Sequence, residues 1–324
     1  MRQPRPAVLE TCEYLVEAGA ADTDAEIVLR EACNDGNVDL VKRMLQRGTR
    51  VRKLPLCDNI EILKLFIETG YDFKSQPDRI AELQERAISR GDVPLLAYLV
   101  DTYGLLLPFS EFSSPAWNII RGEKNQVEIL RYLVENCAFN IDTVYPTYAG
   151  SSEWINILQQ AATLENNPDV VELLLKEGAS TDCPGLQYTA LMSVLKEGSH
   201  GIRTRTVSVI QLLLDYGADV DGSRATDRDP NGQLKPHFQK TPLLYAIYRN
   251  APGSLDAVKL LIKHGADINR GIISPLRLAR ILGNGEIENL LIQHGAVDNS
   301  DLSYTLSDFR RDLFDRATFH QEFV

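Results

Sequence analysis

The chain has 324 residues, of which 44% are hydrophobic and 24% are charged, so it can bury a large core and is not disordered throughout. Its formal net charge is −11, and its Lys and Arg residues do not cluster, which argues against nucleic acid as a partner. The sequence has no run of 18 apolar residues and no signal-peptide pattern at its start, so we expect no membrane span and a cytoplasmic or nuclear location.

Helical patterns begin near the N-terminus. A lone helix is predicted at about residues 8–19, and residues 25–48 contain a helix, a tight turn, a second helix and a terminal glycine. Residues 54–70 contain a degenerate copy of this unit. The same pattern follows at 82–104, at 114–137, where Cys137 occupies the glycine position, and at 153–178.

Three units with clearer patterns follow, at 189–217, 241–265 and 274–295. One helix ending recurs along this half of the chain, as LLLKEGASTD at 173–182, LLLDYGADVD at 212–221, LLIKHGADIN at 260–269 and LLIQHGAV at 290–297. Glycine adopts the left-handed conformation that ends a helix without the steric cost of a Cβ atom, so each copy predicts a helix C-terminus. In the last unit, Ser274 is the expected N-cap and Pro275 the first helical residue.

Repetition every thirty to forty residues indicates a solenoid. The starts of four units share a short motif: Thr241-Pro242-Leu243, Ser274-Pro275-Leu276, Thr189-Ala190-Leu191 and Ser114-Pro115-Ala116. With the paired helices and the Gly-Ala-Asp endings, these motifs resemble ankyrin repeats. The resemblance implies an all-α solenoid of paired antiparallel helices with β-hairpin-like loops over residues 1–296, with about seven to eight repeats, several of them degenerate.

Small residues fall midway along the expected first helices, where stacked repeats approach closely. They are Ala32, Cys33, Ala87, Ala161, Ala162, Ala246 and Ala279. Residues 297–324 are expected to form a C-terminal capping helix and tail, because Leu302, Leu306, Phe309 and Leu313 form an apolar stripe. A partner-binding helix is the alternative interpretation of this stripe.

Metal and cofactor sites are not predicted. The cysteines Cys12, Cys33, Cys57, Cys137 and Cys183 lack metal-ligand spacing and are expected to be reduced thiols. Asp227, Asp229 and Asn231-Gly232 match the first half of a calcium loop, but Phe238 stands where the bidentate Glu is needed. An ordinary turn is the preferred interpretation of this stretch.

Several aromatic residues near the loops are candidates for binding. They are Trp117, Trp154, Tyr188, Phe238 and Tyr245. The resemblance implies that loops and first helices line a concave face, and that Tyr248 and Arg249 occupy variable positions where family members contact partners. Tyr and Arg are also common in interface hot spots. For Trp117 and Tyr245, helical spacing favours a place in the core instead.

Two functions remain open from the sequence. The preferred hypothesis is a non-catalytic scaffold or adaptor that binds a protein segment on the concave face without a cofactor, since no catalytic motif is present. The alternative is a cofactor-free isomerase or cyclase acting on a small apolar molecule in an aromatic-lined pocket. His237, Asp227 and Asp229 are then the acid–base candidates.

Overall fold

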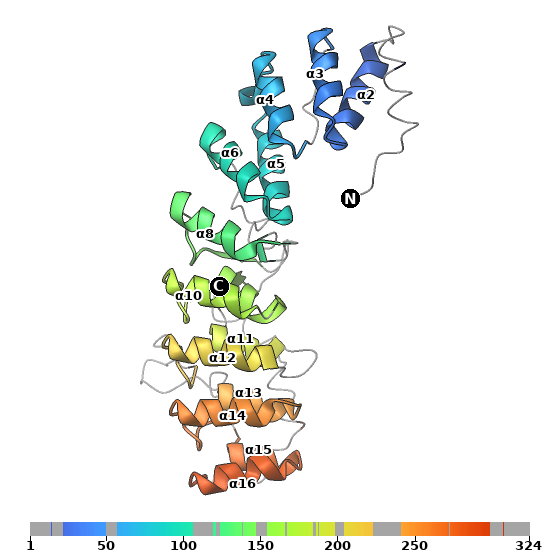
Figure 1. Ribbon diagram of the computed structural model, residues 1–324. Helices are drawn as coiled ribbons and strands as arrows, with labels where there is room; N and C mark the ends of the chain where they lie inside the picture. The colour runs from blue at the N-terminus through green and yellow to red at the C-terminus, as the bar shows by residue number, and fades with distance from the viewer. Residues whose placement is uncertain are drawn as a thin grey trace, which may run out of the picture. The chain divides into compact units, whose positions relative to one another are not determined.

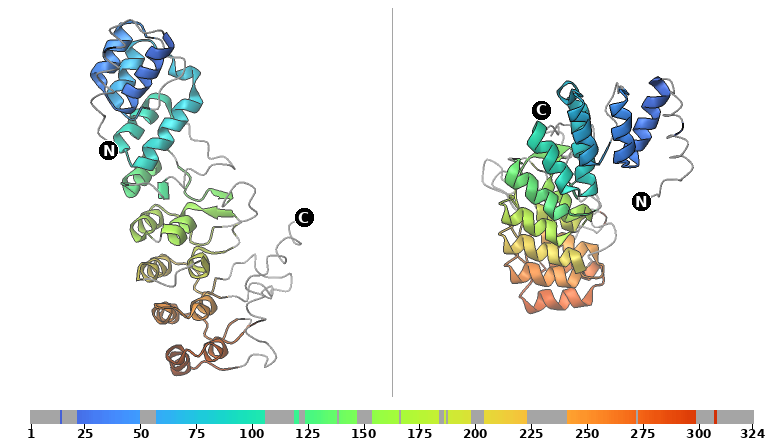
Figure 2. Two further views of the ribbon diagram at one scale, coloured as in Figure 1. Left: turned by 90° about the vertical axis from the view of Figure 1, so that its right-hand side faces the viewer. Right: turned by 45° about the horizontal axis from the view of Figure 1, so that its top comes forward.

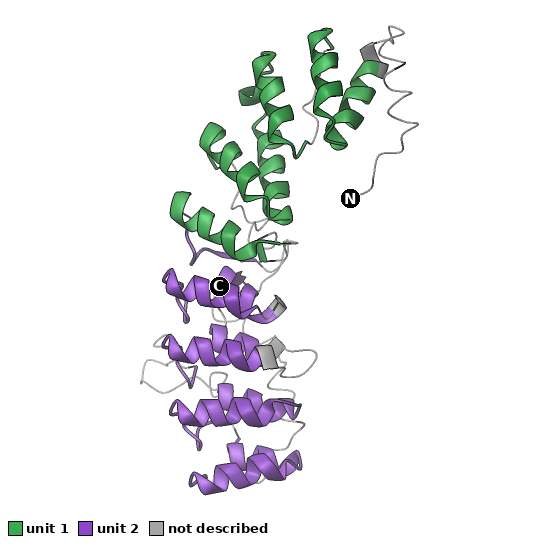
Figure 3. Ribbon diagram, viewed as in Figure 1, with its two compact units in different colours: residues 1–139 green, residues 140–324 purple. Residues whose placement is uncertain are grey.

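A computed structural model describes most of the chain. The described residues are 14, 22–49, 57–105, 119–120, 124–137, 139–146, 154–165, 167–183, 186, 188–197, 204–222, 241–271, 273–298 and 307. By internal packing, the chain divides into two compact units, residues 1–139 and 140–324 (Figure 3). The predicted half repeat at 8–19 and nearly all of the predicted C-terminal capping segment lie outside the described residues.

The described elements of unit 1 are helical. They are α2 (Asp22–Asn34), α3 (Val38–Gln46), α4 (Ile60–Glu68), the short 3₁₀ helix η1 (Phe73–Ser75), α5 (Pro77–Arg90), α6 (Val93–Tyr103) and α8 (Gln126–Asn136). Helices α2 and α3 pack as one pair and α5 and α6 as another. Helix α5 begins earlier than the predicted start of its repeat at residue 82, because Pro77 provides a favourable first helical residue.

The described part of unit 2 contains four helix pairs preceded by a hairpin. Strands β1 (Val144–Pro146) and β2 (Trp154–Asn156) pair antiparallel, with Tyr145 opposite Ile155. The helices are α9 (Ile157–Gln160) with its π-helical continuation η2 (Ala161–Glu165), α10 (Pro168–Lys176), α11 (Ala190–Glu197), α12 (Thr204–Asp215), α13 (Pro242–Arg249), α14 (Ser254–Lys263), α15 (Pro275–Ile281) and α16 (Gly285–Gln293). First helices pack on first helices and second helices on second helices, which gives two rows (Figure 1). Viewed end-on, the strands extend across the helix axes to one side of both rows (Figure 2).

A polar side chain begins each first helix of unit 2. Thr241 and Ser274 accept hydrogen bonds from the backbone N–H groups of Leu244 and Arg277, at 3.3 and 3.4 Å. Asn156 and Thr189 make the equivalent bonds to Gln159 and Met192. Each such cap contributes about 1 kcal/mol to helix stability. The predicted start of the last pair at Ser274 and Pro275 is confirmed.

The small residues lie in the core as predicted. Their relative exposures are 4% for Ala32, 2% for Cys33, 0% for Ala87, Ala161, Ala246 and Ala279, and 1% for Ala162. Larger neighbours fill the space around them, since Leu243, Leu244, Ile247 and Leu278 are also fully buried. The close approach of successive first helices therefore depends on these alanines.

The described second helices end at the predicted glycines, except α8. Gly178, Gly217, Gly265 and Gly295 have φ between 85° and 90°. Cys137, at the corresponding place after α8, has φ −117° instead. A cysteine side chain disfavours the left-handed region, so this helix ends in a different conformation.

Two thiols of unit 1 form a buried pair. Cys33 near the end of α2 and Cys57 before α4 are 2% and 0% exposed and share a hydrogen bond. This bond raises the pKa of Cys33 above its usual range, while the same bond lowers the pKa of Cys57. Cys33, Cys57, Cys137 and Cys183 are free thiols.

Candidate functional site

A series of hydrogen bonds connects the loops of unit 2. Each bond joins a side-chain oxygen in one loop to a backbone N–H group in the next. The pairs are Asp142 with Ser180 at 2.9 Å, Asp182 with Asp219 at 3.2 Å, Asp221 with Asp267 at 3.1 Å and Asn269 with Val297 at 2.8 Å. We call these bonds the loop ladder. It fixes the spacing of the loops that lead into successive first helices.

Trp154 is an exposed aromatic residue of strand β2 in the hairpin. Its side chain is 43% exposed, while its backbone lies in β2 opposite Pro146. Two residues later, Asn156 is 1% exposed and caps α9. The indole is therefore accessible to solvent, while the backbone that carries it is fixed by the pairing with β1 and by the helix cap at Asn156.

Tyr188 occupies a comparable place in the next repeat, immediately before Thr189 at the start of α11. Gln159 of α9 donates a hydrogen bond from Nε2 to the Tyr188 carbonyl, and the same nitrogen lies 3.3 Å from Ser193 Oγ. The Tyr188 side chain is half-buried. Trp154 and Tyr188 thus precede two successive first helices that are joined through Gln159.

Tyr245 does not belong to a binding surface. It is 2% exposed and lies on the buried face of α13, so its predicted role as a binding residue is corrected to a core role. Burial raises the pKa of its hydroxyl above the usual range, and nearby Tyr188 raises it further. Among the described residues, the Tyr245 hydroxyl has no hydrogen-bond partner.

Tyr248 and Arg249 end α13 and are both half-buried. Arg249 Nε donates a hydrogen bond to the Leu195 carbonyl at 3.0 Å, near the end of α11. Because this hydrogen bond joins the end of α13 to the backbone of α11, Arg249 contributes to the stacking of two repeats. The next turn is also joined to its neighbour, since Asn284 Nδ2 lies 2.7 Å from Asn250 Oδ1.

The remaining predicted site residues lie outside the described part of the chain. They are Trp117, Asp227, Asp229, His237 and Phe238. Within the described part, no group of three His, Cys, Asp or Glu residues is arranged to hold a metal ion. The described residues also include no helix with the length and apolar character needed to cross a membrane.

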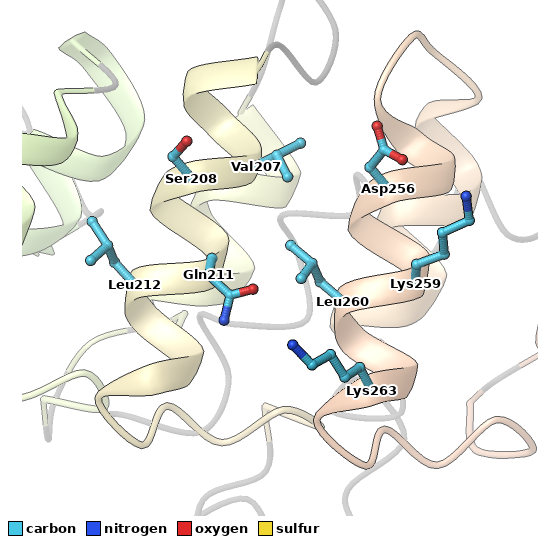
Figure 4. Close-up of a pocket in the computed structure, with 8 residues that line it drawn as sticks. All are labelled: Val207, Ser208, Gln211, Leu212, Asp256, Lys259, Leu260 and Lys263. Atoms are coloured by element: carbon cyan, nitrogen blue, oxygen red, sulfur yellow. The ribbon is translucent and has the colours of Figure 1, made fainter.

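A groove between α12 and α14 was not anticipated from the sequence. It is an open hollow of about 680 Å³. Its lining residues are Val207, Ser208, Gln211, Leu212, Asp256, Lys259, Leu260 and Lys263 (Figure 4). Leu260 and Lys263 point from α14 toward α12, and Val207 points from α12 toward α14. The sequence contained one signal for this groove, the apolar Leu260 between Lys259 and Lys263. The helical pattern alone places Leu260 on the solvent-facing side of its helix and does not predict a groove there.

Three polar groups lie at the end of this groove. Gln211 Nε2 donates to Asp215 Oδ1 at 2.6 Å and lies 3.2 Å from His264 Nε2. His264 Nε2 is also 3.7 Å from Asp215 Oδ1. These contacts hold the Gln211 side chain in place and connect the ends of α12 and α14.

The structure has paired helices, N-capped first helices and loops joined by the loop ladder. A comparison with known protein families agrees with this arrangement. Residues 158–272 match the family model described as ankyrin repeats (3 copies). Residues 158–272 contain ankyrin repeats. The predicted all-α ankyrin-repeat solenoid is therefore confirmed as the fold, and the described helix pairs are compatible with the predicted number of repeats. Ankyrin repeats are generally protein–protein interaction modules.

Similar proteins support the ankyrin fold. The solved structure of an ankyrin repeat domain from Acinetobacter baumannii AYE has a TM-score of 0.50 and 22% identity, over 66% of this chain and 98% of that domain. The Caenorhabditis elegans protein named Ankyrin repeat and KH domain-containing protein mask-1 is 24% identical over 90% of this chain and 11% of its own length. A Bos taurus protein named Dynein axonemal heavy chain 12 is 27% identical over 49% of this chain. The chain spans 53% of that bovine relative.

Proposed function

We propose that the chain is a scaffold or adaptor that binds a segment of a partner protein on the hairpin side of unit 2. The observation that carries this proposal is Trp154, a large aromatic side chain that is 43% exposed on a backbone held by strand pairing and by the α9 cap. Tryptophan and tyrosine are enriched among the residues that dominate binding energy at interfaces. A surface that is already ordered also loses less conformational entropy on binding.

Tyr188 completes the proposed contact centre because it precedes the next first helix, and its backbone is fixed by Gln159. Tyr248 lies near the C-terminal end of the first helix α13, and we include it in the proposed surface. Arg249 is proposed as a residue that positions this turn, since its Nε group bonds to Leu195 of α11. Arg249 then supports the binding surface indirectly. The resemblance to ankyrin repeats had implied that Arg249 contacts the partner itself.

The described residues give no support to the isomerase or cyclase alternative. Its acid–base candidates Asp227, Asp229 and His237 lie outside the described residues, and its expected pocket residue Tyr245 lies in the core. No described observation favours a reaction over binding. Cytoplasm or nucleus remains the predicted location.

Affinity capture from native extract tests the proposal, with wild-type protein and Trp154→Ala compared by mass spectrometry. We expect Trp154→Ala to lose a defined set of proteins while its thermal midpoint changes little, because surface substitutions usually change stability by less than about 0.5 kcal/mol. Tyr216→Ala is the matched control, since Tyr216 is 42% exposed but lies at the end of a second helix. Recovery of the same proteins by wild type and Trp154→Ala would remove Trp154 from the interface.

A further inference from the structure

The groove between α12 and α14 lies on the row of second helices and is built by elements other than those that carry Trp154 and Tyr188. Three of its lining residues are apolar, namely Val207, Leu212 and Leu260. These side chains are only partly buried, so each retains surface that a bound side chain can cover. The groove therefore offers an apolar contact next to charged groups.

Basic residues of unit 2 differ in whether a carboxylate lies beside them. Lys176, Arg270 and Arg280 each have a carboxylate partner, Glu172, Asp221 and Glu288 respectively. Lys259 and Lys263, by contrast, are exposed, and among the described residues neither forms an ion pair. The chain has a net charge of −11, yet no carboxylate of the described residues pairs with these two lysines beside the apolar hollow.

Helix electrostatics explains only part of this arrangement. Asp256 in the first turn of α14 and Lys263 in its last turn both complement the helix dipole. Lys259 and Lys263, however, are four residues apart, where like charges on a helix repel each other. Lys263 points toward α12 and Lys259 away from it, so a separate carboxylate beside each ammonium group would offset this repulsion (Figure 4).

We propose that the α12–α14 groove binds an acidic peptide segment of a partner protein, with an apolar side chain packed between Val207 and Leu260 and carboxylates paired with Lys259 and Lys263. The charges also set the direction of the segment. Asp256 lies at one end of the groove and Lys263 at the other, so the acidic residues of the segment lie toward Lys263 (Figure 4). Gln211, held by Asp215 and His264, limits the groove at the same end.

The test uses the intact protein and two labelled probe peptides in fluorescence anisotropy. One peptide has a single leucine flanked by glutamates, and the other has lysines in place of the glutamates. We expect saturable binding of the acidic peptide that weakens as salt rises, and much weaker binding of the basic peptide. Absence of saturable binding of the acidic peptide, or equal affinity for both peptides, would overturn the proposal.

Charge reversal locates the site. In Lys259→Glu/Lys263→Glu, we expect at least about a tenfold loss of affinity for the acidic peptide and a gain for the basic peptide. Both positions are exposed, so the thermal midpoint should be retained. Lys42→Glu, at an exposed position on α3 in unit 1, is the control and should bind like wild type. Equal binding of the acidic peptide by wild type and the double variant would contradict the assignment.

Two further measurements distinguish this groove from the hairpin surface and from a lipid-binding surface. Trp154→Ala should bind the acidic peptide as wild type does, because Trp154 does not line the groove. Vesicles containing phosphatidylserine should not compete with the peptide. Competition by these vesicles that depends on Lys259 and Lys263 would assign the groove to an anionic lipid surface and overturn the peptide proposal.

Discussion

Single side-chain oxygens connect the loops of unit 2. Asp182, Asp221 and Asn269 each lie four residues after a terminal glycine. Each accepts a hydrogen bond from a backbone N–H group of the next loop. Asn269 shows that the acceptor does not need a negative charge. At Asp221, burial raises the pKa of the carboxyl above its usual value, although the Asp267 N–H group and Arg270 at 3.5 Å act in the opposite direction.

Asp221→Asn therefore tests the cost of the buried charge. Because the folded-state pKa is raised, the ionised carboxylate is disfavoured in the folded protein, and stability is lost as pH rises above the ordinary value of 3.8. The amide retains the oxygen acceptor and cannot ionise. We expect the stability of the variant relative to wild type to increase between pH 3 and pH 7, measured by urea unfolding. A constant difference across this range would contradict the assigned cause.

Tight turns join the two helices of each pair. Among the described glycines, Gly91 in the turn between α5 and α6 leaves the least space for a Cβ atom. Gly91 ends α5 with φ +68°, and Asp92 caps α6 through a 3.0 Å bond to the Leu95 N–H group. Asn125 Nδ2 donates to the Gly91 carbonyl at 2.9 Å. A Cβ atom at position 91 would lie 2.0 Å from the Lys124 carbonyl oxygen, so this turn requires glycine for space as well as for backbone conformation.

Gly91→Ala and Gly70→Ala separate these two requirements. Gly70 has φ +81°, but a Cβ atom there would meet nothing within 4 Å. We expect Gly70→Ala to lower the free energy of unfolding by about 1 kcal/mol and Gly91→Ala by about 2–4 kcal/mol, because the second also creates a clash. Chemical denaturation gives both values. Equal losses would show that the turn at Gly91 relaxes at no cost.

Across the whole molecule, stability in a repeat protein comes from each repeat and from its interfaces with its neighbours. In unit 2, α13 packs against both α11 and α15, and Ala246 on α13 is completely buried. Arg249 adds a hydrogen bond from the same helix to α11. A substitution that destabilises the packing of α13 should therefore destabilise the adjacent repeats first.

Ala246→Leu tests this spread by hydrogen exchange. Overpacking at the joint should cost about 1–3 kcal/mol and increase exchange in α11 to α16. Exchange in α5 and α6 of unit 1 should change much less, because these helices belong to a separately packed unit. A uniform increase in both units would show that the chain unfolds as one cooperative body.

The sequence by itself determined the repeats, because a terminal glycine, an N-cap and the three- to four-residue spacing of apolar side chains act within one helix pair. Ser274 with Pro275 and the buried alanines are examples. Only the tertiary structure decided which side chains face solvent. Tyr245 and Tyr248 lie on one helix, but only the neighbouring repeats bury Tyr245, and Arg249 is engaged by a carbonyl 54 residues away. The α12–α14 groove likewise forms between residues that are distant along the chain, so its shape depends on how two repeats stack.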